Sequence, residues 1–240
     1  MSRRGLFVAP FGELADARVC ADLAAEAEAA GWDGFFLWDH VAYAEPVREI
    51  ADPWVTLTAI AMVTQRLTIG PLVTPLPRRR PHQLARETVT LDRLSHGRLV
   101  LGVGIGSERT GEFDPERFGE EGDMRARGAQ LDAGLDALQG YWDGGFEPRP
   151  VDRIPIWVAA RYPNRKPLRR AARHDGLFPI DLPGPDALRE VVAELPPGLD
   201  VIVTNPPGTD PAPWADAGAT WCLTGFGTQP TLADVRAAIS

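Results

Sequence analysis

Cysteine is scarce in this chain, and long apolar runs are missing. The 240 residues include only Cys20 and Cys222, which is too few for a disulfide framework, and their spacing matches neither a metal site nor a redox motif. No stretch approaches the roughly 18 apolar residues that a membrane helix needs. The first ten residues hold only a short apolar run, so we expect no signal peptide. These absences predict a cytoplasmic protein with no membrane partner and no metal.

An excess of basic residues is also missing. The formal net charge is −8, from 25 lysines and arginines against 33 acidic residues. Such a chain has no broad electrostatic reason to bind nucleic acid or an anionic membrane, and we expect no nucleic-acid partner. The short basic cluster Arg78-Arg79-Arg80 has two interpretations. The simpler one is a solvated loop with surface ion pairs, and the other is local attraction for an anionic ligand.

The composition that is present is that of an ordinary globular protein. Hydrophobic residues make up 44% of the chain and charged residues 24%, and the length allows one large core. No change in composition divides the chain, and its prolines and glycines are spread throughout. We therefore expect a single domain over residues 1–240.

Short apolar runs alternate with helical patterns along the whole chain. The helical segments carry start signals such as Asp16, Asp52 followed by Pro53, and Thr231 followed three residues later by Asp234. The apolar run at 35–38 shows no alternation, which is typical of a strand buried on both faces of a parallel sheet. The expected strands are 6–9, 35–38, 67–73, 98–105, 154–160, 176–180, 199–204 and 220–223.

Eight alternating strands and helices predict an α/β fold with a parallel sheet. Eight such units close naturally into a (β/α)8 TIM barrel of about 250 residues. An open, doubly wound sheet is the structural alternative. The near-regular spacing and the lack of a second domain favour a single compact barrel with short insertions.

In such a barrel the active site lies at the C-terminal ends of the strands, and the second strand ends in Asp39-His40. Of the four histidines, His40 alone stands at a strand end. Because imidazole titrates near neutral pH, it is suited to exchange a proton with a substrate. The alternative is a histidine that only hydrogen-bonds its loop, and Asp39 is expected to orient a ring or cap the loop.

Three glycines alternate along the fourth expected strand, at Gly102, Gly104 and Gly106. They share one face, and glycine in a strand usually marks the close approach of another group. That group is either a flat cofactor ring or tightly layered side chains. The spacing is not that of a dinucleotide fingerprint, so a Rossmann dehydrogenase is disfavoured.

Five segments occur in the order typical of one family. They read GWDGFFLWDH (31–40), LTIGPLVTPLPRRRP (67–81), LDRLSHGRLVLGVGIG (91–106), IPIWVAA (154–160) and RRAARHDGLFP (169–179). On these motifs the chain resembles the bacterial luciferase-like flavin-dependent oxidoreductases and monooxygenases, especially the branch that uses the deazaflavin coenzyme F420.

The resemblance implies a cofactor ring lying across the barrel mouth over strands two to four. His40 would then face the reactive side of the ring, near the substrate. The family often has a non-prolyl cis peptide at the end of strand three, and the matching bond is Pro71–Leu72. The other positions implied to lie near the cofactor are Asp39, Thr74, Gly104, Gly106 and Ser107, with Ala160 and Arg161 near its phosphate.

The chain departs from the family pattern in two places. Members that oxidise sugar phosphates carry a glutamate after strand four, where this chain has Ser107, which argues against their substrate. The segment before strand five, residues 142–153, is short where the family often has an insertion. The mouth is therefore expected to be open or completed by a partner subunit, and the resemblance implies a homodimer.

The leading hypothesis is an F420-dependent oxidoreductase that moves a hydride between the deazaflavin and a small organic substrate, with His40 handling the proton. One alternative is a luciferase-like monooxygenase that uses reduced FMN and a separate flavin reductase. The other is a barrel that binds a flavin or deazaflavin without turning it over.

Overall fold

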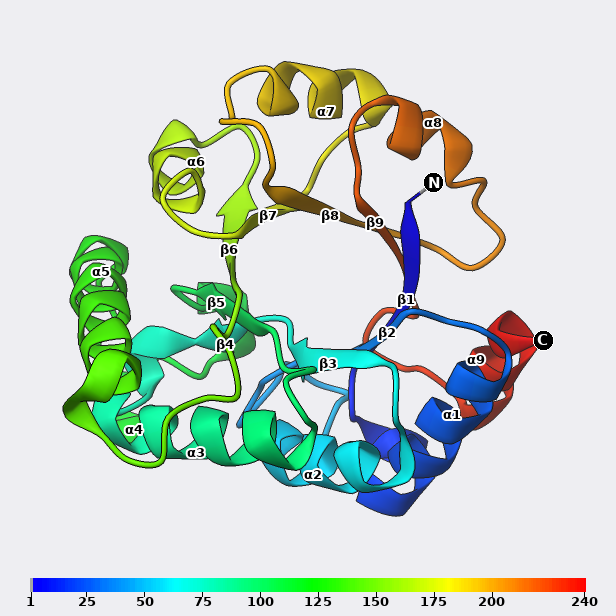
Figure 1. The fold of residues 1–240 in the computed structure, drawn as a ribbon, viewed down its shortest axis with the longest axis horizontal. Coiled ribbons are helices and arrows are strands. Elements are labelled where there is room, and N and C mark those ends of the chain that lie inside the picture. The colour runs from blue at the N-terminus through cyan, green and yellow to red at the C-terminus, as the bar shows by residue number, and fades with distance from the viewer. Residues whose placement is uncertain (1) are drawn as a thin grey trace.

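Nine parallel strands form a nearly closed barrel with helices around its outside (Figure 1). The computed structural model describes residues 2–240. Neighbouring strands follow the order β3-β2-β1-β9-β8-β7-β6-β5-β4. The predicted TIM barrel is confirmed, and the open-sheet alternative is wrong.

The strands agree with the expected apolar runs to within about three residues at most boundaries. The largest difference is in the third expected strand, which the structure divides in two. The strands are β1 (Arg3–Val8), β2 (Gly34–Leu37), β3 (Thr68–Pro71), β4 (Thr74–Pro75), β5 (Leu101–Gly104), β6 (Ile156–Arg161), β7 (Gly176–Ile180), β8 (Asp200–Asn205) and β9 (Trp221–Gly225).

A helix follows every strand position of the barrel, and the connection after β5 adds a further short helix. The helices are α1 (Ala17–Ala29), α2 (Pro53–Val63), α3 (Pro81–Leu94), α4 (Pro115–Phe118), α5 (Met124–Gly140), α6 (Arg165–Ala171), α7 (Pro185–Val192), α8 (Ala212–Asp216) and α9 (Leu232–Ile239). Short 3-10 turns lie at Gly12–Leu14, Leu76–Arg78 and Glu108–Thr110.

The expected helix starts are present as capping contacts. The Asp16 carboxylate accepts a hydrogen bond from the Arg18 backbone N–H, and the Asp52 carboxylate accepts one from Val55. Thr231 begins a reciprocal capping box with an aspartate at its third position. Each cap satisfies backbone donors that the helix itself leaves without partners.

The interrupted third strand closes the barrel, because its two halves stand at opposite ends of the strand order. β3 pairs with β2, and β4 pairs with β5. A parallel bridge between Ile69 and Leu99 joins the two sides, supported by a 2.9 Å hydrogen bond from the Val100 N–H to the Ile69 carbonyl. The nine strands therefore occupy eight positions around the barrel.

Glycine permits this closure. A Cβ atom on Gly70 would lie 1.9 Å from the Val100 carbonyl oxygen, and one on Gly102 would lie 2.5 Å from the Pro71 carbonyl oxygen. Neither position has room for a side chain. Glycine at position 102 is therefore explained by the close approach of a neighbouring strand.

Large aromatic side chains fill the lower part of the barrel interior. Trp157 and Trp221 meet edge to face with ring centroids 5.5 Å apart, and Phe36 packs against both. All three are almost fully buried. Because this end is filled, the interior has room for a ligand only toward the C-terminal ends of the strands.

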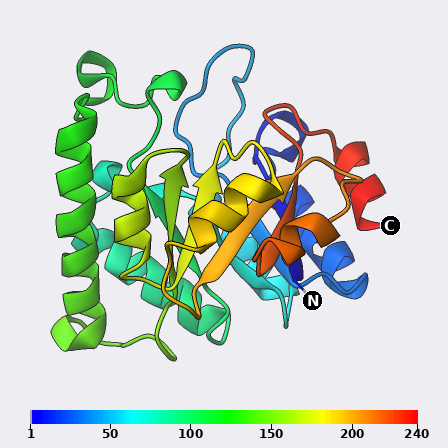
Figure 2. The ribbon, with the colours of Figure 1, turned by 90° about the horizontal axis from the view of Figure 1, so that it is seen from above.

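The two long connections after β2 and β5 rise together at that end of the barrel (Figure 2). The first covers residues 38–52. The second covers residues 105–123 and contains α4. The upper part of the site is therefore built from segments whose structure depends on contacts between loops.

Candidate active site

A cavity of about 450 Å³ opens at the mouth of the barrel. Its apolar lining comes from strand ends and includes Phe7, Trp38, Leu72, Val73 and Phe178. Its polar lining includes His40, Tyr43, Ser107, Arg109, Arg161, Asp181 and Thr204. An apolar hollow with a few converging polar groups is the usual form of a small-molecule site.

His40 lies in this cavity and is paired with a buried carboxylate. Its Nδ1 atom is 2.8 Å from Oε2 of Glu112, whose side chain is fully buried. Facing an ionised carboxylate, Nδ1 carries the proton and donates it to the hydrogen bond. The Nε2 atom is then the ring nitrogen left to exchange a proton with a molecule in the cavity.

Both carboxylate oxygens of Glu112 are fully engaged. Oε1 accepts hydrogen bonds from the Val41 backbone N–H at 2.6 Å and from Arg78 at 2.9 Å, while Oε2 also accepts one from Thr110. Burial acts to raise the pKa of this carboxyl. The hydrogen bond and charge of His40, together with Arg78 and the Val41 N–H, outweigh burial and lower the pKa.

A second buried carboxylate, Asp39, lies behind the cavity wall. It pairs with Arg78 at 2.6 Å and with Arg79 at 2.8 Å, and it accepts a 2.8 Å hydrogen bond from the Thr74 hydroxyl. Arg78 thus bridges Asp39 and Glu112. Arg78 and Arg79 do form ion pairs, but their partners are fully buried carboxylates, so the interpretation of a solvated loop with surface ion pairs is wrong for these two residues.

Aromatic rings surround His40. The Tyr43 ring centroid is 5.0 Å from that of His40, and the rings of Trp38 and Phe11 lie 5.8 and 6.0 Å away. Burial and the nearby Glu112 carboxylate raise the pKa of the Tyr43 phenol against a smaller opposing effect of Arg109. Tyr43 therefore presents a neutral hydroxyl to the cavity.

The expected cis peptide is displaced by one residue. The non-prolyl cis bond joins Leu72 to Val73, so the prediction of Pro71–Leu72 is wrong. The reason lies in the strand register. Pro71 still pairs with Leu37, and the Leu72 N–H donates to the Leu37 carbonyl at 2.7 Å, so the chain leaves the sheet only after Leu72.

Most of the other predicted residues fall into two groups. Leu72, Gly104, Gly106, Ser107 and Arg161 line the cavity with His40. Pro71, Asp39, Thr74 and Ala160 are buried behind its wall. Because side chains alternate along a strand, Ala160 packs in the outer core while its neighbour Ala159 faces the cavity.

The alternating glycines serve different purposes. Gly104 leaves open the cavity wall, where a Cβ would lie 3.0 Å from Val73 Cγ2. Gly106 has a φ of +78°, and a Cβ there would lie 2.0 Å from the ring of Phe113. The glycine at 106 therefore allows the following segment to fold back over the strand end.

Sequence reasoning missed Glu112, the acidic residue of the site. The family comparison concerns Ser107, directly after the strand, and predicts no acidic residue at that position. The structure brings a carboxylate from five residues further along by folding the segment after β5 back against His40. The sequence holds no local signal for this contact, because the burial of Arg78, which requires carboxylate partners, is known only from the tertiary structure.

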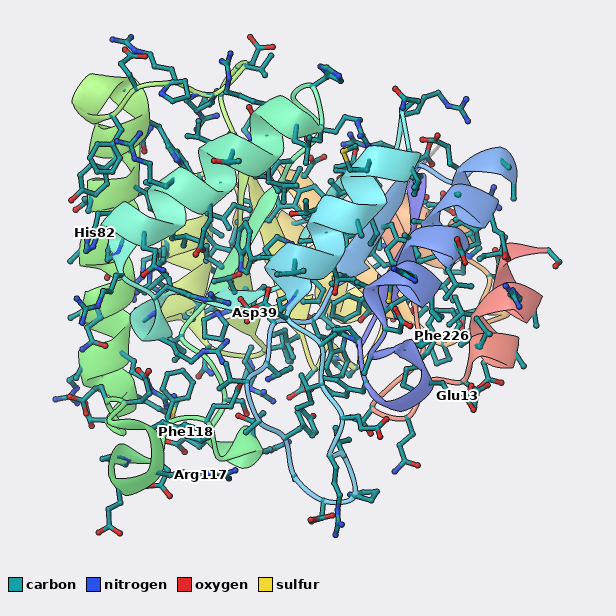
Figure 3. All side chains as sticks on the ribbon, turned by 90° about the horizontal axis from the view of Figure 1, so that it is seen from below. Glu13, Asp39, His82, Arg117, Phe118 and Phe226 are labelled. Atoms are coloured by element: carbon teal, nitrogen blue, oxygen red, sulfur yellow. The ribbon has the colours of Figure 1, made fainter. Side chains whose placement is uncertain are left out.

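The remaining histidines lie away from this cavity. Figure 3 shows His82 at the edge of the molecule on α3, far from Asp39 in the interior. His96 follows the end of α3, and His174 follows α6. Within residues 2–240, His40 is thus the histidine that lines the cavity.

Comparison with known sequences identifies the family. The model of the luciferase-like monooxygenase family matches residues 7–199. An uncharacterized protein of Mycobacterium tuberculosis is 32% identical over 223 residues, covering 78% of this chain and 73% of that protein. An F420-dependent glucose-6-phosphate dehydrogenase of Nakamurella multipartita is 32% identical over 169 residues, covering 60% of this chain and 46% of the dehydrogenase.

Solved structures of other proteins share the fold. An F420-dependent secondary alcohol dehydrogenase in complex with an F420-acetone adduct has a TM-score of 0.80 at 16% identity, covering 99% of this chain and 96% of its own. The oxygenating constituent of 3,6-diketocamphane monooxygenase from Pseudomonas putida, in complex with FMN, has a TM-score of 0.67 at 18% identity, covering 86% of this chain and 68% of its own.

The chain belongs to the luciferase-like monooxygenase family of oxidoreductases. The resemblance inferred from the five sequence motifs is confirmed. Over residues 2–240, the structure contains no helix long and apolar enough to cross a membrane and no group of three or more side chains placed to hold a metal ion.

Proposed function

We propose that this protein is an F420-dependent oxidoreductase that acts on a small organic substrate bound in the mouth cavity. The observation that carries the proposal is the pairing of His40 with the buried Glu112 at the edge of an apolar cavity. When bound, the deazaflavin supplies hydride transfer. The chain contributes binding, orientation and a residue that exchanges the accompanying proton.

The cavity suits a flat cofactor with a charged extension. Trp38, Leu72 and Val73 offer an apolar surface, and Gly104 adds no side chain to it. Arg109 and Arg161 are the arginines of the lining, and in this proposal they bind the phosphate of the cofactor. These features fit F420, and they fit FMN equally well at the ring and the phosphate.

His40 is the proposed proton donor and acceptor. Glu112 holds Nδ1, so Nε2 faces the cavity, and the lowered pKa of Glu112 keeps the carboxylate ionised at neutral pH. An imidazole held in this way is able to take the proton of a substrate hydroxyl as hydride leaves the carbon, or to give a proton to a carbonyl oxygen as hydride arrives. Burial of Glu112 keeps bulk water from competing for its carboxylate.

Cofactor titration tests the proposal directly. Purified protein is titrated with F420 and, separately, with FMN, following the ligand fluorescence and the intrinsic tryptophan fluorescence to which Trp38 contributes. We expect saturable binding of F420. Tight binding of FMN with no response to F420 would overturn the proposal and favour the reduced-FMN monooxygenase with its separate reductase.

His40→Ala separates catalysis from binding. We expect turnover of F420 with a panel of small alcohols and ketones to fall by roughly 10²–10⁴-fold, while the cofactor dissociation constant changes little. His82→Ala is the matched control, because His82 is exposed on α3. Unchanged turnover in His40→Ala would remove His40 from the mechanism and favour a barrel that only binds its cofactor.

A further inference from the structure

A cluster of basic side chains begins at the cavity and continues along α6. Although the chain as a whole has a formal charge of −8, its segment 161–173 contains no acidic residue. Six cationic side chains fall in that segment, at Arg161, Arg165, Lys166, Arg169, Arg170 and Arg173. This segment is therefore positively charged, whereas the molecule as a whole is negatively charged.

Acidic neighbours compensate only part of this charge. Arg165 pairs with Glu194 at 2.9 Å, and Arg170 and Arg173 share the single carboxylate of Asp132. Arg161 pairs with Asp181 at the cavity. Within residues 2–240, Lys166 and Arg169 have no ion-pair partner, and both are exposed.

The two unpaired cations also lie close to other cations. Arg169 follows Arg165 by four residues and Lys166 precedes Arg170 by four, so each unpaired cation lies one helical turn from a cation that already has a carboxylate partner. Like charges at this spacing disfavour a helix. A bound polyanion would turn this repulsion into attraction.

The position of α6 connects these cations to the cavity. The helix packs on the outside of β6 and β7 (Figure 1) and begins four residues after Arg161, the last residue of β6. Because β6 ends at the barrel mouth, the first turn of α6, with Arg165 and Lys166, lies at the rim. A ligand that leaves the cavity beside Arg161 meets this turn next.

We propose that Arg161, Arg165, Lys166 and Arg169 form an α6 ridge that binds a polycarboxylate tail extending from the cavity. The proposal rests on the proposed function and specifies the ligand: the oligoglutamate tail of F420, which FMN lacks. Carboxylates of the tail would replace Asp181 and Glu194 as partners of Arg161 and Arg165. Both of those ion pairs are partly exposed, so exchanging partners costs little.

Three deazaflavins of decreasing charge test the ridge. These are F420 with a long oligoglutamate tail, F420 without glutamates, and the deazaflavin that also lacks the phosphate. We expect the tailed form to bind most tightly, with a tail-dependent advantage that shrinks as salt is raised. In Lys166→Gln/Arg169→Gln, the affinity for the tailed form falls roughly fivefold, and the affinity for the tail-less form is unchanged.

Two variants serve as controls, one for the loss of a cation elsewhere on the barrel and one for folding. Arg18→Gln removes one exposed cation from α1, on another part of the barrel, and should leave the tail-dependent advantage intact. Lys166→Arg/Arg169→Lys keeps both charges and should bind the tailed form like the unmodified protein. Loss of affinity in the charge-keeping variant as well would contradict an electrostatic ridge.

Lys166 also provides a readout that needs no turnover, because it is the single lysine of the chain. Its reaction with an amine-specific acylating reagent is followed by peptide mass spectrometry, with the α-amino group as an internal reference. We expect tailed F420 to slow the acylation of Lys166, whereas tail-less F420 leaves the acylation rate unchanged at equal occupancy.

The outcomes separate this proposal from the proposed function. Equal affinity for tailed and tail-less F420, with Lys166 equally reactive in both complexes, would overturn the ridge and leave the F420 assignment standing. Failure of all three deazaflavins to bind would overturn the cofactor assignment and the ridge with it.

Discussion

At the scale of single residues, the Glu112 carboxylate determines which nitrogen of His40 faces the cavity. Its acceptor oxygen lies 2.8 Å from Nδ1, and Arg78, Val41 and Thr110 hold the carboxylate from its other sides. Because Arg78 also pairs with Asp39, the tautomer of His40 is tied to a buried network of charges behind the cavity wall.

Glu112→Gln tests that control of the tautomer. The amide presents an NH₂ donor as well as a carbonyl, so it no longer holds Nδ1 in the protonated form. We expect slower turnover, with a smaller loss than in His40→Ala, and a change in the ¹⁵N chemical shifts of the His40 ring. Glu116→Gln, at an exposed position on α4, is the control. Identical His40 ring shifts in Glu112→Gln would contradict the assignment.

At the scale of elements, two features build the site: the closure of the barrel between β3 and β5, and the segment 105–123 that carries Glu112. Closure depends on strand backbones lying too close for side chains. The segment depends on a few packing contacts made outside regular strands. Mutations at the closure should therefore introduce steric clashes, whereas mutations in the segment 105–123 should remove packing contacts.

Gly70→Ala should destabilise the barrel by about 3 kcal/mol or more, because its Cβ would lie 1.9 Å from a backbone carbonyl oxygen that has no space to move. Gly140→Ala is the matched control. Gly140 ends α5 with helical dihedrals and nothing within 4 Å of its Cβ position, so alanine should stabilise by up to about 1 kcal/mol. Urea unfolding measures both, and equal stability of the two variants would contradict this account of closure.

Phe113 anchors the segment 105–123. Its ring lies against Gly106 on one side, and the buried guanidinium of Arg127 sits 4.1 Å from its centroid. We expect Phe113→Ala to cost about 3 kcal/mol and to release Glu112 from His40, which limited proteolysis and the His40 ring shifts would detect. Phe118→Ala, at a partly exposed position on α4 (Figure 3), should change little. Equal protease resistance in both variants would argue against this anchor.

At the scale of the whole molecule, the stability should fall as the pH drops below neutrality. Burial lowers the pKa of His174 from 6.5, with Arg173 adding to the effect and Asp175 opposing it. The unfolded chain therefore binds a proton at this site more readily than the folded one. The folded state loses stability as the pH falls below 6.5, until His174 is protonated in the folded chain as well.

His174→Gln isolates this contribution. Between pH 7 and 5 the free energy of unfolding should decline less steeply in the variant than in the unmodified protein, as measured by urea unfolding at each pH. Glu112 contributes to the stability at lower pH. Because its pKa is lowered in the folded chain, its carboxylate stabilises the fold above about pH 4.5, and that stability is lost on further acidification. Parallel pH profiles for the two proteins above pH 5 would contradict the role of His174.

Most of the fold was predictable from the sequence, because its signals are local. Buried strands appear as short apolar runs, and helix starts appear as capping residues whose contacts span three or four positions. The count of eight strand–helix units then predicted a barrel, and the barrel fold predicted that the site lies at the C-terminal ends of the strands. His40 followed from the rule that the ends of strands bear function.

The fine structure of the third strand was less predictable. The run from 67 to 73 is interpreted as one strand, although its Gly70-Pro71 pair is a local signal of an interruption. That signal does not show where the strand resumes or which neighbour each half pairs with. The break arises from barrel closure, since β3 and β4 must pair with different neighbours. The displaced cis bond at Leu72–Val73 follows the same register.

The sequence by itself determined the barrel, the family and the position of His40 at a strand end. Only the tertiary structure decided that Asp39 lies behind the wall, that Glu112 is the carboxylate of the site, and that the basic helix α6 begins at the rim. The physical reason is the distance along the chain over which each kind of contact acts. Capping and strand patterning act within a few residues, whereas the contact between His40 and Glu112 joins positions 72 residues apart through a segment whose fold depends on its packing.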